Sequence, residues 1–157
     1  MTQVAKLEGC QIIAIDLHDH RLKLSEKYGA DALINAGKED PVKRVNEITG
    51  RGSDIVIETA GRVQTVEQTP LLVRKAGTVA LIGESKGFLD LGKADEGVFF
   101  TSYISPIEYP MAIDLISKKI LDVKALVTHK FKLVDFETAI HTAENSAEKP
   151  VKIIIAA

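Results

Sequence analysis

The chain has 157 residues, of which 45% are hydrophobic and 27% are charged, and its formal net charge is −2. This length suits one domain with a sizeable core, so the composition argues against a disordered chain. The balanced charge gives no reason to expect nucleic acid or an anionic membrane as a partner.

Short β-branched runs alternate with longer amphipathic stretches along the chain. In chain order they predict a strand over Gln11–Asp16, a helix over Asp19–Tyr28, a strand over Ala32–Asn35, a helix over Asp40–Thr49, a strand over Asp54–Glu58, a helix over Val63–Lys75, strands over Thr78–Ile82 and Val98–Ile104, helices over Ile107–Lys118 and Phe136–Ala143, and a strand over Val151–Ile155. Asp40 suits a helix N-cap, Pro41 the first helical position and Gly50 the end of that helix, whereas Pro70 marks a kink.

Strands separated by helices of roughly ten residues are typical of βαβ units and a parallel sheet. The strand runs are apolar throughout, as expected when helices cover both faces of a sheet. We therefore predict an α/β fold with a doubly wound, mostly parallel, Rossmann-type sheet. We expect a single domain over residues 1–157, including a C-terminal return segment at 105–157.

Ligands of doubly wound sheets bind beyond the carboxyl ends of the strands, so those positions are candidates for a site. The first strand ends in Asp16, whose carboxylate can accept hydrogen bonds from both hydroxyls of an adenosine ribose and repels a 2′-phosphate. That asymmetry favours NAD over NADP; the alternative is that Asp16 only caps the following loop. Arg21 either covers the adenosine or is a solvated helix residue.

Two further strand ends carry small residues, which let a ligand approach the backbone closely. They are Glu58–Arg62, where Gly61 has the alternative role of a tight turn, and Ile82–Ser85. Glu58 and Glu84 resemble an acid–base pair, but both lie where a cofactor would pass, so we interpret them as pocket lining.

Metal binding has few candidates in this sequence. His18 and His20 flank Asp19, but no third convergent ligand is visible, so a solvated loop is the preferred interpretation and no metal site is predicted. The single cysteine, Cys10, excludes an internal disulfide and fits a reducing cytoplasm. The N-terminus lacks an apolar leader, and no run approaches the roughly 20 apolar residues of a membrane span, so we expect a cytoplasmic protein with no membrane partner.

Four segments carry a resemblance to a known family: IIAIDLHDHRLKLSEKYGADALIN, DIVIETAGRVQTVEQTPLLVRKAGTVALIG, LDVKALVTHKFKLVDFETAI and VKIII. Together they resemble the C-terminal half of zinc-type medium-chain alcohol and polyol dehydrogenases, over essentially the whole chain. The resemblance implies a cofactor site made of Asp16 and Arg21 at the adenosine ribose, Thr59, Ala60 and Arg62 along the middle of NAD, and Ile82, Gly83, Glu84, Ser102 and Ile104 around the nicotinamide.

The sequence also departs from that family's pattern. The motif GxGxxG, which holds the pyrophosphate at a helix N-terminus, is absent, as is the strand before it, which in the family lies at the centre of the sheet. The zinc-carrying N-terminal domain has no counterpart, so the resemblance implies zinc only in that missing domain and no catalytic residue here. We expect NAD binding by this chain alone to be weak or absent, with no turnover.

Loss of a central strand would leave two rows of unpaired backbone groups and a slot in the core. Each buried unsatisfied group costs about 1–3 kcal/mol, while a whole domain is stable by only about 5–15 kcal/mol. Either the flanking strands close up and pair, or a partner chain supplies contacts, or the chain is a fragment. We expect a homodimer, because the resemblance implies that Val98–Ile104 pairs across a dimer axis.

The leading hypothesis is the cofactor-binding domain of an NAD-dependent alcohol or polyol dehydrogenase, an oxidoreductase, inactive by itself. The alternatives are a non-catalytic dimerising remnant, one half of a split enzyme with a separate N-terminal half, or another doubly wound protein such as a methyltransferase or a receiver domain. A receiver domain is disfavoured, since it needs an acidic cluster at the first strand and a lysine at the fifth. The sequence does not identify the substrate alcohol.

Overall fold

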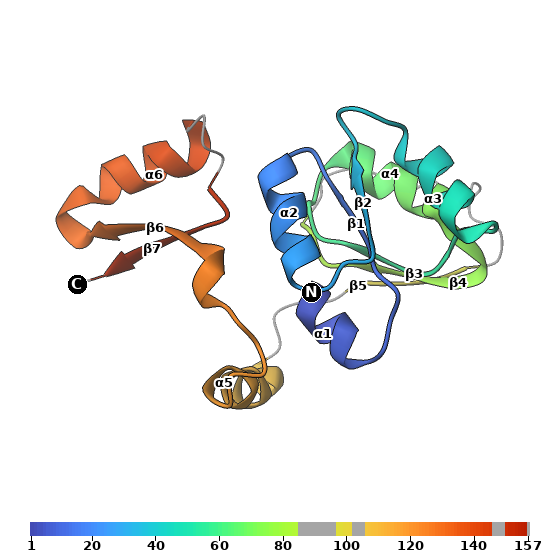
Figure 1. The fold of residues 1–157 in the computed structure, drawn as a ribbon. Coiled ribbons are helices and arrows are strands. Elements are labelled where there is room, and N and C mark those ends of the chain that lie inside the picture. The colour runs from blue at the N-terminus through green and yellow to red at the C-terminus, as the bar shows by residue number, and fades with distance from the viewer. Residues whose placement is uncertain (85–96, 102–105, 146–149, 157) are drawn as a thin grey trace. The chain divides into compact units, whose positions relative to one another are not determined.

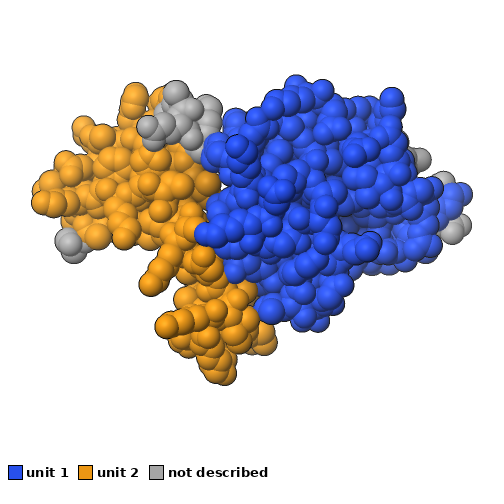
Figure 2. Space-filling model, in the orientation of Figure 1, with its two compact units in different colours: residues 1–105 blue, residues 106–157 orange. Residues whose placement is uncertain are grey.

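The computed structural model describes residues 1–84, 97–101, 106–145 and 150–156. The chain divides into two compact units, Met1–Ser105 and Pro106–Ala157, which Figure 2 colours separately and which are described one at a time. Ser102 and Ile104, both predicted to line a nicotinamide pocket, lie outside the described residues. Within the described ranges, no helix combines the length and the apolar character needed to span a membrane.

Helices and strands alternate through the first unit (Figure 1). In chain order they are α1 (Thr2–Leu7), β1 (Ile13–Asp16), α2 (Asp19–Lys27), β2 (Ala32–Asn35), α3 (Pro41–Thr49), β3 (Ser53–Glu58), α4 (Val63–Leu72), β4 (Val73–Leu81) and β5 (Val98–Thr101). Each strand pairing in this unit is parallel, which confirms the predicted α/β fold with parallel strands.

The described strands of the first unit form two sheets. β1 pairs with β2, with Ile13 opposite Ala32 and Asp16 opposite Asn35. The order β3-β4-β5 makes up the second sheet. β1 and β3 are therefore edge strands of different sheets. The alternative that the strands flanking the missing central strand close up and pair with each other is wrong for β1 and β3.

One apolar cluster joins the two sheets. Ile34 from β2, Val45 from α3 and Leu72 from α4 are buried at its centre. Ile13 of β1 and Val56 of β3 pack against it. The two sheets thus share a core although they share no strand.

Local signals define both ends of α3, as predicted. The Asp40 carboxylate accepts the backbone N–H groups of Val42 at 2.9 Å and Lys43 at 3.3 Å, which satisfies donors that the first turn leaves unpaired. Pro41 occupies the first turn, and Gly50 ends the helix with a φ of 74°. These caps hold the helix that supplies part of the shared core.

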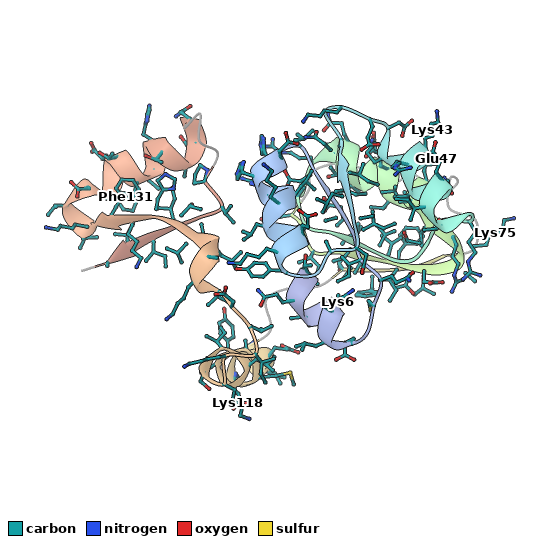
Figure 3. The ribbon with its side chains drawn as sticks, in the orientation of Figure 1. Lys6, Lys43, Glu47, Lys75, Lys118 and Phe131 are labelled. Carbon is teal, nitrogen blue, oxygen red and sulfur yellow. The ribbon has the colours of Figure 1, made fainter. Side chains whose placement is uncertain are left out.

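A lysine–aspartate pair ties α1 to the strands. The Nζ atom of Lys6, labelled on α1 in Figure 3, lies 2.8 Å and 2.9 Å from the two carboxylate oxygens of Asp31. Asp31 Oδ2 also accepts the backbone N–H of Ile12 at 2.8 Å. The hydrogen bond from Lys6, followed by the one from Ile12, lowers the pKa of Asp31 below its ordinary value.

The helix predicted over Val63–Lys75 is wrong in its last residues, because α4 ends at Leu72 and β4 follows at once. Pro70 has no N–H for the carbonyl of Val66, which instead accepts the hydroxyl of Thr69 at 2.8 Å. The helix ends two residues after that interruption. The pairing of β3 with the start of β4 contains a bulge, so the first residues of β4 lack the sequence pattern of a regular strand.

The second unit contains α5 (Tyr109–Ser117), β6 (Val127–Lys132), α6 (Phe136–Asn145) and β7 (Lys152–Ala156), with single 3₁₀ turns at Pro106–Glu108, Lys124–Leu126 and Leu133–Asp135. β6 pairs in parallel with β7 and is not among the predicted strands. Its side chains alternate between half-buried and exposed, so it lacks the continuous apolar run expected of a strand covered on both faces. Phe131, labelled in Figure 3, stacks on His129 with 6.4 Å between ring centroids.

Candidate functional site

The carboxyl end of β1 carries Asp16, whose carboxylate is only partly engaged. The backbone N–H of His18 donates to Asp16 Oδ1 at 2.9 Å, and Arg21 Nη1 lies 3.9 Å from Asp16 Oδ2. The side chain of Asp16 is 30% exposed and that of Arg21 is 38% exposed. A carboxylate in this state keeps lone pairs for hydroxyl donors of a ligand.

Asp19, which lies between His18 and His20, is bound to the end of β2 and to the loop after it. Asp19 accepts Asn35 Nδ2 at 2.5 Å and Lys38 Nζ at 2.6 Å, and these hydrogen bonds, Lys38 foremost, lower its pKa. The imidazole rings of His18 and His20 stack with 5.7 Å between centroids. Among the residues that the structure describes, no group of three or more His, Cys, Asp or Glu side chains is placed to hold a metal ion.

Glu58 ends β3, and its carboxylate points into the following turn. It is 5% exposed, and its Oε1 accepts the N–H of Ala60 at 2.9 Å, the N–H of Gly61 at 3.0 Å and the hydroxyl of Thr65 at 2.7 Å. Glu58 therefore shapes the wall of the site by holding the turn, and its oxygens are already committed. Sequence reasoning missed Thr65; the spacing of a carboxylate two and three residues before backbone donors is the signal that could have indicated the turn.

Gly61 and Gly83 bring the ends of β3 and β4 into contact. Gly61 has a φ of 64°, and a Cβ on it would lie 2.4 Å from the carbonyl oxygen of Glu84. A Cβ on Gly83 would lie 2.3 Å from the backbone nitrogen of Gly61. The carbonyl of Glu58 accepts the N–H groups of Ile82 and Gly83 at 2.8 Å and 3.0 Å. Both glycines are therefore required by close backbone packing at this edge of the sheet.

The other predicted site residues within the described part of the chain surround these turns. Gly83 is half-buried, whereas the remaining side chains are exposed: Thr59, Ala60, Arg62, Ile82 and Glu84. A cavity of about 190 Å³ is lined by Ile15, the residue before Asp16, and also by Glu58, Thr59 and Ala60. The carboxyl ends of β1 and β3 thus border one cavity, and β4 ends against the same turn.

Residues 1–118 match the model of a protein family described as zinc-binding dehydrogenase. The chain belongs to this family. It resembles the "uncharacterized zinc-type alcohol dehydrogenase-like protein YdjJ" of Escherichia coli K12, with 34% identity over 155 residues that make up 95% of this chain and 44% of the relative. The chain thus spans about half the length of the curated relatives it matches, and it corresponds to the C-terminal half of zinc-type medium-chain dehydrogenases.

Solved structures of dehydrogenases share this fold. The E. coli protein ECK1772, described as an oxidoreductase/dehydrogenase of unknown specificity, superposes with a TM-score of 0.90 and 32% identity, over 99% of this chain and 47% of that one. A zinc-binding dehydrogenase from Sinorhizobium meliloti 1021, solved bound to NADP, gives a TM-score of 0.84 and 25% identity, over 99% of this chain and 48% of that one. The predicted Rossmann-type fold is confirmed.

Proposed function

We propose that this chain is the nucleotide-binding part of an NAD-dependent alcohol or polyol dehydrogenase. The observation that carries the proposal is the partly exposed carboxylate of Asp16 at the end of β1, next to a cavity that the end of β3 also lines. We propose that both units belong to one domain of a cytoplasmic protein, the location being suggested by the single cysteine.

The residues present fit NAD at its adenosine end and along its middle. Asp16 has acceptor capacity for the two ribose hydroxyls, with Arg21 beside it. Thr59 and Ala60 expose a turn that the Glu58 carboxylate holds through hydrogen bonds, so a ligand can approach the backbone there. Gly83 and Glu84 continue this surface to the end of β4. Bound NAD supplies a hydride acceptor, and these residues would bind and orient it.

The described residues do not provide a zinc centre, so no step of the proposal passes through a metal. We also propose that the chain alone binds NAD weakly and does not turn over an alcohol. The physical reason is that GxGxxG, the sequence that cradles a pyrophosphate on backbone N–H groups, is absent from it.

Titration of the 157-residue chain with NADH, followed by amide NMR shifts, tests the proposal. We expect dissociation constants weaker than about 0.1 mM and shifts concentrated at Asp16, Thr59, Ala60 and Gly83. Asp54, at the other end of β3, serves as the internal control. Shifts spread evenly over both ends of β3, or no shift at millimolar NADH, would contradict a cofactor site at the carboxyl ends.

We propose further that the chain forms a homodimer through β5. This strand ends the order β3-β4-β5 and exposes Val98 by 60% and Phe100 by 49%. An exposed apolar edge strand is a surface on which another strand can pair. Light scattering on a size-exclusion column should give twice the 17.1 kDa mass of the chain; a concentration-independent monomer would overturn this.

A further inference from the structure

The segments that follow β1 and β2 lie side by side, because the two strands pair in parallel and end together. The carbonyl of Asp16 accepts the backbone N–H of Ala36 at 3.1 Å. A Cβ on Gly37 would lie 3.8 Å from Cδ2 of Leu17, the residue after Asp16. The segment that leads to Lys38 therefore runs directly beside the segment that carries Asp16.

A bridge of side chains crosses between these two segments, which we name the strand-end clamp and define by Asp19, Asn35 and Lys38. Asn35 is 9% exposed; its Nδ2 donates to Asp19 Oδ1 at 2.5 Å, and its Oδ1 accepts the N–H of Gly37 at 2.9 Å. Lys38 Nζ donates to the other carboxylate oxygen, Asp19 Oδ2, at 2.6 Å. An almost buried amide thus fixes the position of the Asp19 carboxylate, and that carboxylate binds the ammonium of Lys38.

The clamp determines where the positive charge of Lys38 lies. A lysine ammonium is a compact charge on a flexible stem, so the acceptors that it finds decide its position. The hydrogen bond from Lys38 is also the foremost cause of the lowered pKa of Asp19, so the carboxylate is ionised at neutral pH. The side chains of Lys38 and Asp19 are 65% and 56% exposed, and an exposed pair of this kind is weak and is screened by salt.

We propose that Asp19 is a second determinant of cofactor choice, because it binds the Lys38 ammonium and so withholds that charge from a 2′-phosphate. This inference rests on the proposed function, in which the adenosine ribose lies at Asp16. A phosphate on that ribose is repelled by the Asp16 carboxylate and needs a nearby cation to compensate. NAD lacks the 2′-phosphate, so the position of Lys38 matters for NADP alone.

The ratio of NADPH affinity to NADH affinity tests the inference in amide NMR titrations of the 157-residue chain. Asp19→Asn keeps an oxygen for the Asn35 amide but removes the charge that holds Lys38, so the ratio should rise about fivefold. Adding Lys38→Met to this variant should return the ratio to the parent value. The gain should also shrink in about 0.5 M salt, because salt screens exposed charges.

Asp31→Asn is the matched control. Asp31 accepts Lys6 Nζ at 2.8 Å, and both partners are exposed, as they are in the clamp. This pair lies at the amino end of β2, whereas Asn35 is at its carboxyl end. The control changes the net charge by the same amount and releases a lysine away from the strand ends, so the ratio should stay at the parent value.

Three results would overturn the inference. The first is an unchanged ratio in Asp19→Asn. The second is a gain that survives Lys38→Met, since Asp19 would then act through its own charge. The third is an equal gain in Asp31→Asn, since net charge alone would then set the ratio. If the parent chain binds NADH while one of these results appears, only this inference fails, whereas binding of neither nucleotide at millimolar concentration removes the proposed function as well.

Discussion

The ends of β1 and β3 carry the same kind of side chain in opposite physical states. Asp16 is 30% exposed, accepts one backbone N–H and lies 3.9 Å from a guanidinium. Glu58 is 5% exposed, and its Oε1 alone accepts three donors from the turn that follows. Position at a strand end therefore does not decide whether a carboxylate is available to a ligand or stabilises the following turn. That depends on how many hydrogen-bond donors the next residues direct at it.

The contrast predicts that removing Glu58 destabilises the protein more than removing any other side chain at the site. Glu58→Ala leaves the N–H groups of Ala60 and Gly61 and the hydroxyl of Thr65 without their acceptor, at a cost of about 3 kcal/mol. Urea unfolding followed by circular dichroism measures the loss. Glu58→Gln, which keeps one acceptor oxygen, should lose about 1 kcal/mol, and equal losses for both variants would contradict this account.

A smaller loss is expected where the ends of β3 and β4 touch. Gly83→Ala places a Cβ 2.3 Å from the backbone of Gly61, so the two strand ends must separate, at a cost of about 2 kcal/mol. Gly50→Ala is the matched control, because its φ is 74° but no atom lies within 4 Å of the added Cβ. Backbone strain alone should cost about 1 kcal/mol there. A control that loses more than Gly83→Ala in urea unfolding would show that the close contact is unimportant.

The sequence predicts most of this fold because its local signals agree with one another. The caps of α3 and the apolar runs of β1, β2 and β3 each indicate the element that forms. The start of β4 and the whole of β6 escape prediction for a physical reason. One begins with a bulge and the other is half exposed, so neither shows the continuous apolar run of a fully covered strand.

The candidate site is predictable only as a set of strand ends. Asp16 and the small residues after β3 and β4 follow from where a parallel sheet binds ligands. The buried state of Glu58 does not, because it depends on donors that only the folded turn brings to its carboxylate. The division into two sheets at β1 and β3 does not follow from the strand patterns, since a strand's pattern does not show which neighbours it has. The expectation of an open slot came only from the resemblance, through the central strand that this sequence lacks.

Asp16→Asn tests whether the exposed carboxylate of Asp16, unlike the buried one of Glu58, serves a ligand. The substitution should change stability very little. Asparagine keeps an oxygen for the N–H of His18, so we expect a loss below about 0.5 kcal/mol. Nucleotide preference should change instead, because the repulsion of a 2′-phosphate disappears. The ratio of NADH to NADPH affinity should fall about tenfold in the NMR titration. If neither the affinity ratio nor the stability changes, Asp16 does not contact the cofactor and only caps the following loop.

The smallest effect is expected far from the site, at the exposed pair of Lys6 and Asp31. The folded state lowers the pKa of Asp31 below its ordinary 3.8, chiefly through the hydrogen bond from Lys6. The pair therefore stabilises the fold above pH 3.8, and this contribution is lost as the pH falls through the lowered pKa. Asp31→Asn should unfold at a slightly lower urea concentration than the parent chain at pH 7. This difference should shrink on acidification, and it should also shrink in about 0.5 M salt, because salt screens exposed ion pairs. Lys6→Met should reproduce much of the effect, and the double variant should add little. If the difference grows as the pH falls, the pair does not act through the ionised carboxylate.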